Sequence, residues 1–147
     1  MIWLLRHGEA EDDAADDASR KLTEKGRRQA ESAGRAMAAI GVELDACLTS
    51  PKVRARDTAE IACRELGVEA EETDALRGGE FDIAEVTVGR GNVLLVGHEP
   101  DFHRAIQAAT GGLVKLRKGG LAAVDGSELH RLFEPSDLER IAGAPGA

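Results

Sequence analysis

Aromatic residues and cysteines are scarce in this chain of 147 residues. It has one Trp, three Phe and no Tyr, so we do not expect the aromatic platforms on which single-stranded nucleic acid stacks. Its two cysteines, Cys47 and Cys63, show no disulfide-like pattern, and we interpret them as small core residues or idle thiols in a reducing compartment. The core must come mostly from Leu, Ile, Val and Ala, and a single domain of this length can build one.

Long hydrophobic runs and an excess of positive charge are also absent. No apolar run approaches the ~18 residues of a membrane-spanning helix, and the apolar start is too short for a signal peptide, so we expect a cytoplasmic protein. The net charge of −8 argues against nucleic acid and against an acidic membrane surface as partners. An anionic substrate stays possible, because a local cluster of arginines can outweigh the net charge nearby.

Apolar runs alternate with helical patterns along the chain. We predict strands at residues 2–5, 44–49, 68–72 and 92–96, helices at 23–40, 51–66 and 100–110, and a hairpin at 121–133. Thr23 and Ser50 are the expected N-caps of the first two helices, and residues 74–91 are weakly patterned. This order predicts an α/β fold, a three-layer αβα sandwich with a mostly parallel central sheet, in one domain over residues 1–135 with a loose C-terminal segment at 136–147.

Polar side chains follow three of the predicted strands at the point where each strand ends. Arg6 and His7 follow the first strand, and His98 follows the strand at 92–96. Ser50 leads from the second strand into a helix that carries Arg54 on its inward face. Ligand sites in open α/β sheets lie past the carboxyl ends of the strands, so we expect these residues to line one pocket. A neutral imidazole can attack there while guanidinium groups hold an anion.

A metal site built on the two histidines is the alternative for this pocket. Imidazole nitrogens are common ligands of Zn²⁺. Two adjacent arginines, however, would repel a cation, and the arrangement therefore favours an anion.

Four segments in this order resemble the motifs of a known family, the histidine phosphatase superfamily, also called phosphoglycerate-mutase-like or RHG. They are Arg6-His7-Gly8, Arg20-Lys21-Leu22-Thr23 (with Lys21 where the family has proline), the run from Ser50 to Ala59 (SPKVRARDTA), and Gly97-His98-Glu99-Pro100. The resemblance implies the phosphoglycerate-mutase-like fold. The short chain and the His-Glu-Pro sequence are most similar to the small SixA-type phosphohistidine phosphatases.

The resemblance also implies a role for each matching residue. His7 would be the nucleophile that forms a phosphohistidine intermediate, and Arg6 and Arg54 would hold the phosphoryl oxygens. His98 would be a further phosphate donor, with Arg20 and Gly8 as additional substrate or phosphate contacts. No metal and no other cofactor is implied, because charge neutralisation by these groups would replace Mg²⁺.

The general acid is the open point of the sequence. Larger family members use a carboxylic acid from the region after the second helix, where this chain offers Glu80 and Asp82. Glu80 is the better candidate, with a solvated loop carboxylate as the alternative reading, and Glu9 is interpreted as a positioning or loop residue. An alkoxide leaving group needs a strong proton donor, whereas an imidazole leaves more easily. We therefore favour hydrolysis of a P–N bond.

Three functions remain open from the sequence. The first is a metal-independent phosphatase acting through His7, with the phosphohistidine of a protein as its favoured substrate. The second is a phosphomonoesterase of the same superfamily acting on a small phosphorylated metabolite. The third is an idle phosphate-binding domain.

Overall fold

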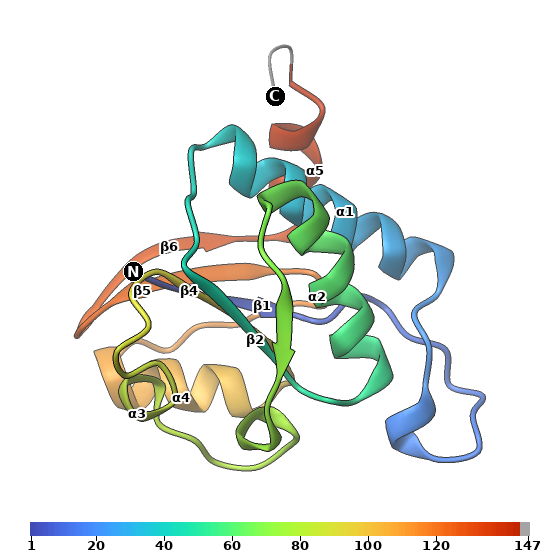
Figure 1. The fold of residues 1–147 in the computed structure, drawn as a ribbon, viewed down its shortest axis with the longest axis horizontal. Helices are drawn as coiled ribbons and strands as arrows, with labels where there is room; N and C mark the ends of the chain where they lie inside the picture. Colours follow the sequence, from blue (N-terminus) through green and yellow to red (C-terminus); the bar gives the residue numbers. More distant parts are fainter. Residues whose placement is uncertain (145–147) are drawn as a thin grey trace.

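The computed structural model of the protein describes residues 1–144, so residues 145–147 of the predicted C-terminal segment lie outside the described residues. A six-stranded sheet in the order β3-β2-β4-β1-β5-β6 forms the centre (Figure 1). Its strands are β1 (Ile2–Arg6), β2 (Ala46–Thr49), β3 (Ala70–Glu72), β4 (Val93–Gly97), β5 (Leu121–Asp125) and β6 (Glu128–Phe133). The first four are parallel, and β5 and β6 are antiparallel to their neighbours, which confirms the mostly parallel sheet.

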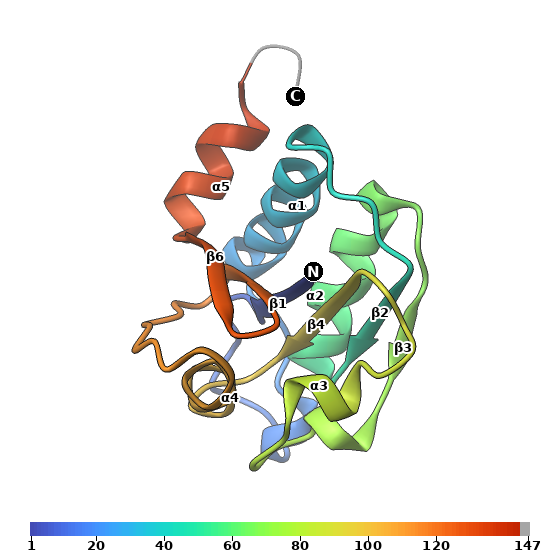
Figure 2. The same cartoon turned by 90° about the vertical axis from the view of Figure 1, so that its left-hand side faces the viewer.

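Helices cover both faces of the sheet, which confirms the three-layer architecture. One face carries α1 (Glu24–Ala39), α2 (Val53–Leu66) and α5 (Pro135–Ala142), and the other carries α3 (Ile83–Val86) and α4 (Asp101–Thr110), as the two ribbon views show (Figures 1 and 2). Two short 3₁₀ helices, η1 (Asp17–Ser19) and η2 (Asp74–Leu76), lie in the connections.

The central strands are apolar throughout because both of their faces are buried. In β1, Trp3 and Leu5 pack with the α1, α2 and α5 side of the core, while Leu4 packs with the α3 and α4 side. Side chains alternate across a strand, so a continuous apolar run supplies both layers. Every residue of β4, the strand between β2 and β1, is buried.

The first helix begins as the sequence predicts, and the second does not. The Thr23 side chain accepts a hydrogen bond from the Gly26 N–H at the start of α1. The prediction of Ser50 as the N-cap of the second helix is wrong: α2 begins at Val53, and its N-cap residue, Lys52, makes no side-chain capping bond. The reason is that the Ser50 hydroxyl lies 2.8 Å from His98 Nε2. It also accepts the Lys52 N–H in the turn that precedes α2, and it does not bond to a residue within the helix.

The segment predicted to be loose contains a helix. Residues 135–142 form α5, which starts with Pro135 and a capping box between Glu134 and Asp137. Leu138 is 1% exposed and joins the core beneath α1. The helix is stabilised because Leu138 is buried beside α1 and Ile141 packs against the same cluster, contacts that local composition does not reveal. No helix within residues 1–144 has the length and hydrophobicity of a membrane span.

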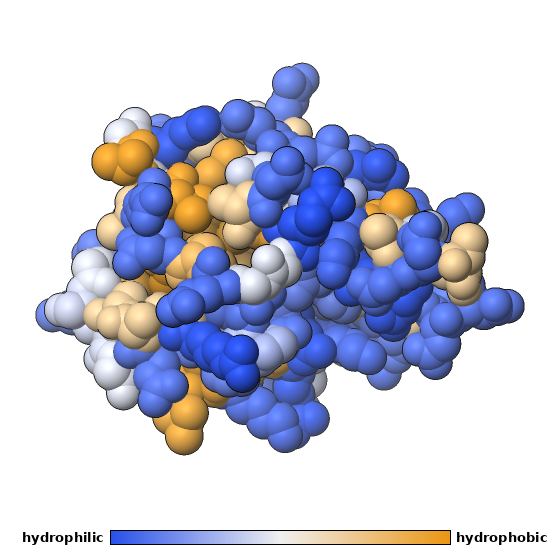
Figure 3. All heavy atoms as spheres, turned by 90° about the horizontal axis from the view of Figure 1, so that it is seen from below, coloured by the Kyte–Doolittle hydropathy of each residue, from blue (hydrophilic) through white to orange (hydrophobic). Residues whose placement is uncertain are grey.

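The two halves of the surface differ in polarity. Seen from the α3 and α4 side, apolar residues gather over the half that holds these helices (Figure 3). The half that carries the loop at residues 8–21 is hydrophilic in the same view. The carboxyl end of β1 leads into this hydrophilic half (Figure 1).

Candidate active site

Three strand ends meet at one edge of the sheet. Because β4 lies between β2 and β1, Arg6 pairs with Gly97 and Thr49 pairs with Val96. The ladder continues one step beyond the strands: the His7 N–H donates to Gly97 O (3.1 Å) and the Ser50 N–H donates to Val96 O (3.0 Å). The strand register itself therefore brings His7, Ser50 and His98 together.

His7 is buried, and its hydrogen bond defines which nitrogen can react. Nδ1 lies 2.7 Å from Gly8 O. A carbonyl oxygen only accepts, so Nδ1 carries the proton and Nε2 keeps its lone pair. The pKa of His7 is lowered to about 3, mainly by burial and also by His98, Arg54 and Arg6. The hydrogen bond to the Gly8 carbonyl opposes this shift. The ring is thus neutral at physiological pH, with a free lone pair on Nε2.

The two predicted arginines are held by backbone carbonyls. Arg6 Nη1 donates to Leu116 O (3.0 Å), and Arg54 Nη1 donates to Asp17 O (2.7 Å). Within residues 1–144, both Nε atoms are buried and have no hydrogen-bond partner. Each guanidinium is therefore fixed in place with donor capacity left for an anion.

His98 faces His7 across the site. The ring centroids are 5.2 Å apart at an interplanar angle of 57°. Burial lowers the pKa of His98 to about 4, assisted by the positive charges of Arg54 and Lys52. Its Nε2 contacts the Ser50 hydroxyl, while its Nδ1 is buried and has no partner among the described residues. A bound anion would favour the protonated ring, which can donate from both nitrogens.

A hollow of about 260 Å³ opens over these groups. Arg6, His7, Arg54, His98 and the predicted Arg20 all line it. Further cations that the sequence reasoning missed also line it, namely Lys52, Arg77 and Lys118. Lys52 could have been found, because it lies inside the SPKVRA segment; nothing in the sequence placed the other two.

Asp17 pairs with two of the cations that line the hollow, Lys52 and Arg54. Its carboxylate lies 3.1 Å from Lys52 Nζ and 3.2 Å from Arg54 Nη2. Hydrogen bonds from Lys52 and then Arg54 hold the pKa of this carboxyl well below its usual range. Arg20 lies beside it, donating to Glu11 O (2.8 Å) and to Asp17 Oδ1 (3.4 Å). An ionised carboxylate thus pairs with Lys52 and with two cations, Arg54 and Arg20, that the sequence analysis assigned to a phosphoryl group.

Gly8 lies behind His7. Its N–H donates to Thr58 Oγ1 (3.1 Å), and Thr58 Oγ1 donates to Arg54 O (2.7 Å). A Cβ at Gly8 would approach Gly26 O to 2.5 Å, so only glycine allows α1 to pack this closely. Gly8 therefore links the loop that follows β1 to α1 and α2, and its N–H already donates to Thr58.

The predicted carboxylic acids lie away from His7. Glu80 lines a neighbouring hollow with Arg104, and Asp82 accepts the Glu85 N–H at the start of α3. Glu9 contacts Lys25 and Thr23.

Two other carboxylates, Glu99 and Asp101, do line the His7 hollow. Glu99 binds His103 through both oxygens, at 2.7 Å to its N–H and 2.8 Å to Nδ1. Asp101 accepts the Gly79 N–H (3.2 Å). Among residues 1–144, no group of three or more His, Cys, Asp and Glu side chains is arranged to hold a metal ion.

A larger hollow of about 520 Å³ lies at the other end of the sheet. It is lined by α3, α4 and the first residues of β1, and it is mostly apolar. Of the residues that the sequence offered for the site, only Asp82 lines it. Size alone therefore does not identify the reactive site here; the side-chain chemistry does.

Comparison with known proteins identifies relatives of this chain. Residues 2–92 match the family described as the histidine phosphatase superfamily (branch 1). The mitochondrial serine/threonine-protein phosphatase Pgam5 of Drosophila ananassae is 40% identical over 70 residues, which is 48% of this chain and 24% of that protein. The chain therefore spans about a quarter of the length of this relative. An uncharacterised protein of Picosynechococcus sp. is 33% identical over 134 residues, covering 82% of this chain and 81% of that protein.

Solved structures with the same fold cover nearly the whole chain. The protein histidine phosphatase SixA in complex with tungstate superposes with a TM-score of 0.81 at 25% identity, over 93% of this chain and 98% of SixA. A phosphoserine phosphatase of Entamoeba histolytica, in complex with 3-phosphoglyceric acid, shares the fold at a TM-score of 0.70 and 15% identity, over 93% and 98%. With its ordered motifs, its site and the family match over residues 2–92, the chain belongs to the histidine phosphatase superfamily (branch 1), and its fold is SixA-like.

Proposed function

We propose that this phosphatase hydrolyses the phosphoryl group of phosphohistidine on a protein, through a covalent intermediate on His7. The proposal depends on one observation above all: His7 presents an unprotonated Nε2 in a hollow whose walls are two fixed guanidinium groups. Likeness to the histidine phosphatase SixA supports the choice of substrate.

In the first step, His7 Nε2 attacks the phosphorus atom. A P–N bond to His7 forms while the P–N bond to the substrate imidazole breaks, and the electron pair of that bond leaves with the substrate imidazole. Arg6 and Arg54 neutralise the equatorial oxygens, and His98 in its protonated form donates to a further oxygen. The phosphoryl group displaces the Asp17 carboxylate from Arg54 and Lys52.

In the second step, water attacks the phosphorus of phospho-His7. The P–O bond to water forms, the P–N bond to His7 breaks, and inorganic phosphate and neutral His7 result. The substrate imidazole leaves as a neutral ring when its other nitrogen is protonated, so the first step needs no carboxylic acid. We include metal independence in the proposal, because the lining cations perform the charge neutralisation that Mg²⁺ provides elsewhere.

Phosphate release from a phosphohistidine protein, compared with a panel of phosphate esters, tests the substrate class. We expect the phosphohistidine protein to be hydrolysed faster than the phosphate esters. This difference should be the same with and without EDTA. Acid-stable esters hydrolysed briskly, with little release from phosphohistidine, would contradict the proposal.

The His7→Asn variant tests the nucleophile. We expect kcat/KM to fall by about 10³ or more, and the radioactive phosphoryl label that wild-type protein retains after rapid denaturation at alkaline pH to disappear. Unchanged phosphate binding by the variant would separate this role from misfolding. Turnover that survives the substitution would contradict the intermediate.

A phosphomonoesterase acting on a small metabolite is the second candidate. The observation that favours it is the presence of Glu99 and Asp101 in the hollow, either of which could protonate an alkoxide. For this function, Glu99→Gln or Asp101→Asn would reduce ester turnover far more than turnover of phosphohistidine.

A further inference from the structure

A second hollow, of about 370 Å³, adjoins the site and is lined mainly by cations. It shares Arg6 and Lys118 with the hollow over His7. Its other charged lining residues are Lys25, Lys115, Arg117 and one carboxylate, Glu9, which lies 3.7 Å from Lys25. The phosphoryl site therefore continues sideways into a positively charged surface.

The cations of this surface come from one extended segment. In residues 113–118, Val114 and Leu116 are buried, whereas Lys115, Arg117 and Lys118 point to solvent. We call Lys115, Arg117 and Lys118 the basic rim.

The same segment also holds the reactive loop. The carbonyl of Leu116 accepts from Arg6, and the Gly119 N–H lies 3.1 Å from both Arg6 O and His7 O. The basic rim is thus fixed in position relative to the reacting groups.

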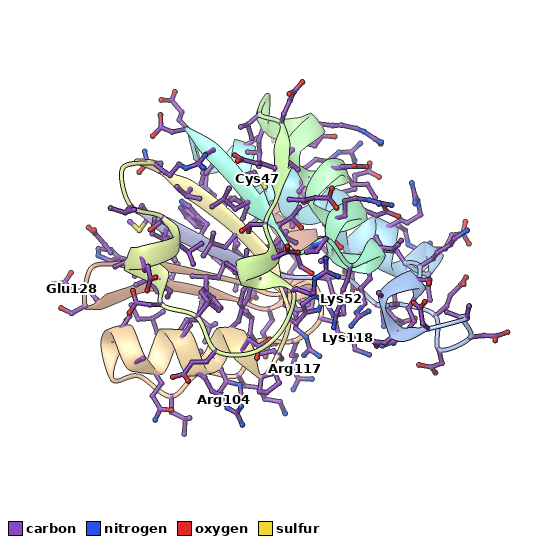
Figure 4. The ribbon with its side chains drawn as sticks, turned by 60° about the horizontal axis from the view of Figure 1, so that its bottom comes forward. Cys47, Lys52, Arg104, Arg117, Lys118 and Glu128 are labelled. Carbon is purple, nitrogen blue, oxygen red and sulfur yellow. The ribbon has the colours of Figure 1, made fainter. Side chains whose placement is uncertain are left out.

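Most of this positive charge is not neutralised internally. Within residues 1–144, Lys115 and Lys118 form no ion pair, and Arg117 Nε lies 3.5 Å from Glu134. Residues 102–124 contain no Asp or Glu, although the whole chain has a net charge of −8. Figure 4 shows Lys52, Lys118, Arg117 and Arg104 along one side of the molecule.

We propose that the basic rim is a docking surface for acidic side chains that flank the phosphohistidine of the partner protein, an inference that rests on the proposed function. The hollow over His7 has room for a phosphoryl group and an imidazole, so the rest of the partner must lie across its edges. Opposite charges on the facing surfaces would steer the partner and fix its orientation. Leu113, 82% exposed, adds an apolar contact at the end of the same segment.

An anionic membrane fits this surface less well than a protein. The acidic loop at residues 9–17 contacts Lys52, a residue lining the hollow over His7, through Asp17, and it would face a flat anionic surface together with the basic rim. Repulsion from that loop would offset the attraction of the rim. A folded protein can present acids to the rim alone.

The test uses full-length protein and a phosphohistidine domain whose residues beside the histidine are acidic. The double variant Lys115→Glu/Arg117→Glu changes only rim residues outside the His7 hollow. The matched control is Arg64→Glu/Arg131→Glu, the same charge change on α2 and β6. We expect the rim variant to lower kcat/KM on the domain by about tenfold or more and to flatten its dependence on salt. Hydrolysis of free phosphohistidine should change less than twofold, and the control variant should behave as wild type.

Binding measurements separate this inference from the proposed function. Affinity for the unphosphorylated domain should fall in the rim variant and recover when the acids of the domain are changed to lysine. A wild type that binds the domain but does not hydrolyse it contradicts the proposed function and still supports docking. Equal losses in the rim and control variants would overturn docking. Docking would also be overturned if the rim substitutions weakened binding to phosphatidylglycerol vesicles but did not change binding to the phosphohistidine domain.

Discussion

In the hollow over His7, three of the candidate residues are fixed by main-chain carbonyls, whereas His98 contacts the Ser50 hydroxyl. The Gly8 carbonyl sets the tautomer of His7, and the carbonyls of Leu116 and Asp17 orient Arg6 and Arg54. Such contacts leave Nε2 of the histidine and part of each guanidinium for the substrate. Part of the Arg54 guanidinium is already occupied, because its Nη2 pairs with the Asp17 carboxylate.

Asp17 competes with phosphate for Arg54 and Lys52, so its removal should tighten anion binding. We expect Asp17→Asn to lower the inhibition constant of inorganic phosphate about threefold to tenfold, which corresponds to ~0.7–1.4 kcal/mol. The control is Asp13→Asn, on the same loop, which removes the same charge without these contacts. An inhibition constant that rises in Asp17→Asn would show that the carboxylate organises the site instead of blocking it.

The buried histidines should make the free energy of unfolding depend on pH. The folded protein holds the pKa of His98 near 4, below the value of ~6.5 of the unfolded chain, so the unfolded state binds more protons between these values. Stability should therefore fall as pH drops from about 6.5 to about 4. Between pH 7 and pH 4.5, we expect the free energy of unfolding to fall by about 1–2 kcal/mol less in His98→Gln than in wild type. Urea unfolding at the two pH values measures this difference. Parallel curves for the two proteins would contradict the lowered pKa.

Among the elements, β1 and α5 make different contributions. The strand delivers Arg6 and His7 to the site, whereas α5 lies on the α1 face, opposite α3 and α4 (Figure 2). Leu138 joins the buried cluster that contains Trp3 and Leu5. The last helix therefore contributes to the hydrophobic core that packs against β1. None of its residues lines the hollow over His7.

Truncation of Leu138 should separate stability from activity. We expect Leu138→Ala to reduce the free energy of unfolding by about 2–4 kcal/mol, because it opens a cavity beneath α1. At 25 °C, kcat/KM should stay within twofold of wild type. Leu132→Ala, on β6 with 45% of the side chain exposed, is the control and should cost less than half as much. Equal costs would mean that α5 packs more loosely than the structure describes.

In the whole molecule, one sheet joins the site to both helical layers. Ligand binding at the strand ends should therefore stabilise the complete fold. We expect phosphate at 100 times its dissociation constant to add ~2.7 kcal/mol and to raise the melting temperature. The Arg54→Lys variant should show a much smaller rise at the same concentration, because lysine lacks the two-pronged guanidinium. Sodium chloride of equal ionic strength controls for screening, and an equal rise with chloride would contradict specific binding.

Several features follow from the sequence because they depend on local pattern. The apolar runs before Arg6, Ser50 and His98 predicted the strands and, with the ordered motifs, the family and the parallel sheet. The same runs predicted that His7, Arg54 and His98 line one pocket, and the structure brings them into one hollow.

Other features were decided only by tertiary structure, because they are contacts between distant segments. Asp17 meets Arg54 across 37 residues, and Leu116 meets Arg6 across 110. Ser50 was predicted to cap a helix, but it lies beside His98 because strand pairing places the two at one edge. Burial by the whole fold, and not the neighbouring sequence, is also the main cause that lowers the pKa of His7 and keeps its ring neutral at physiological pH.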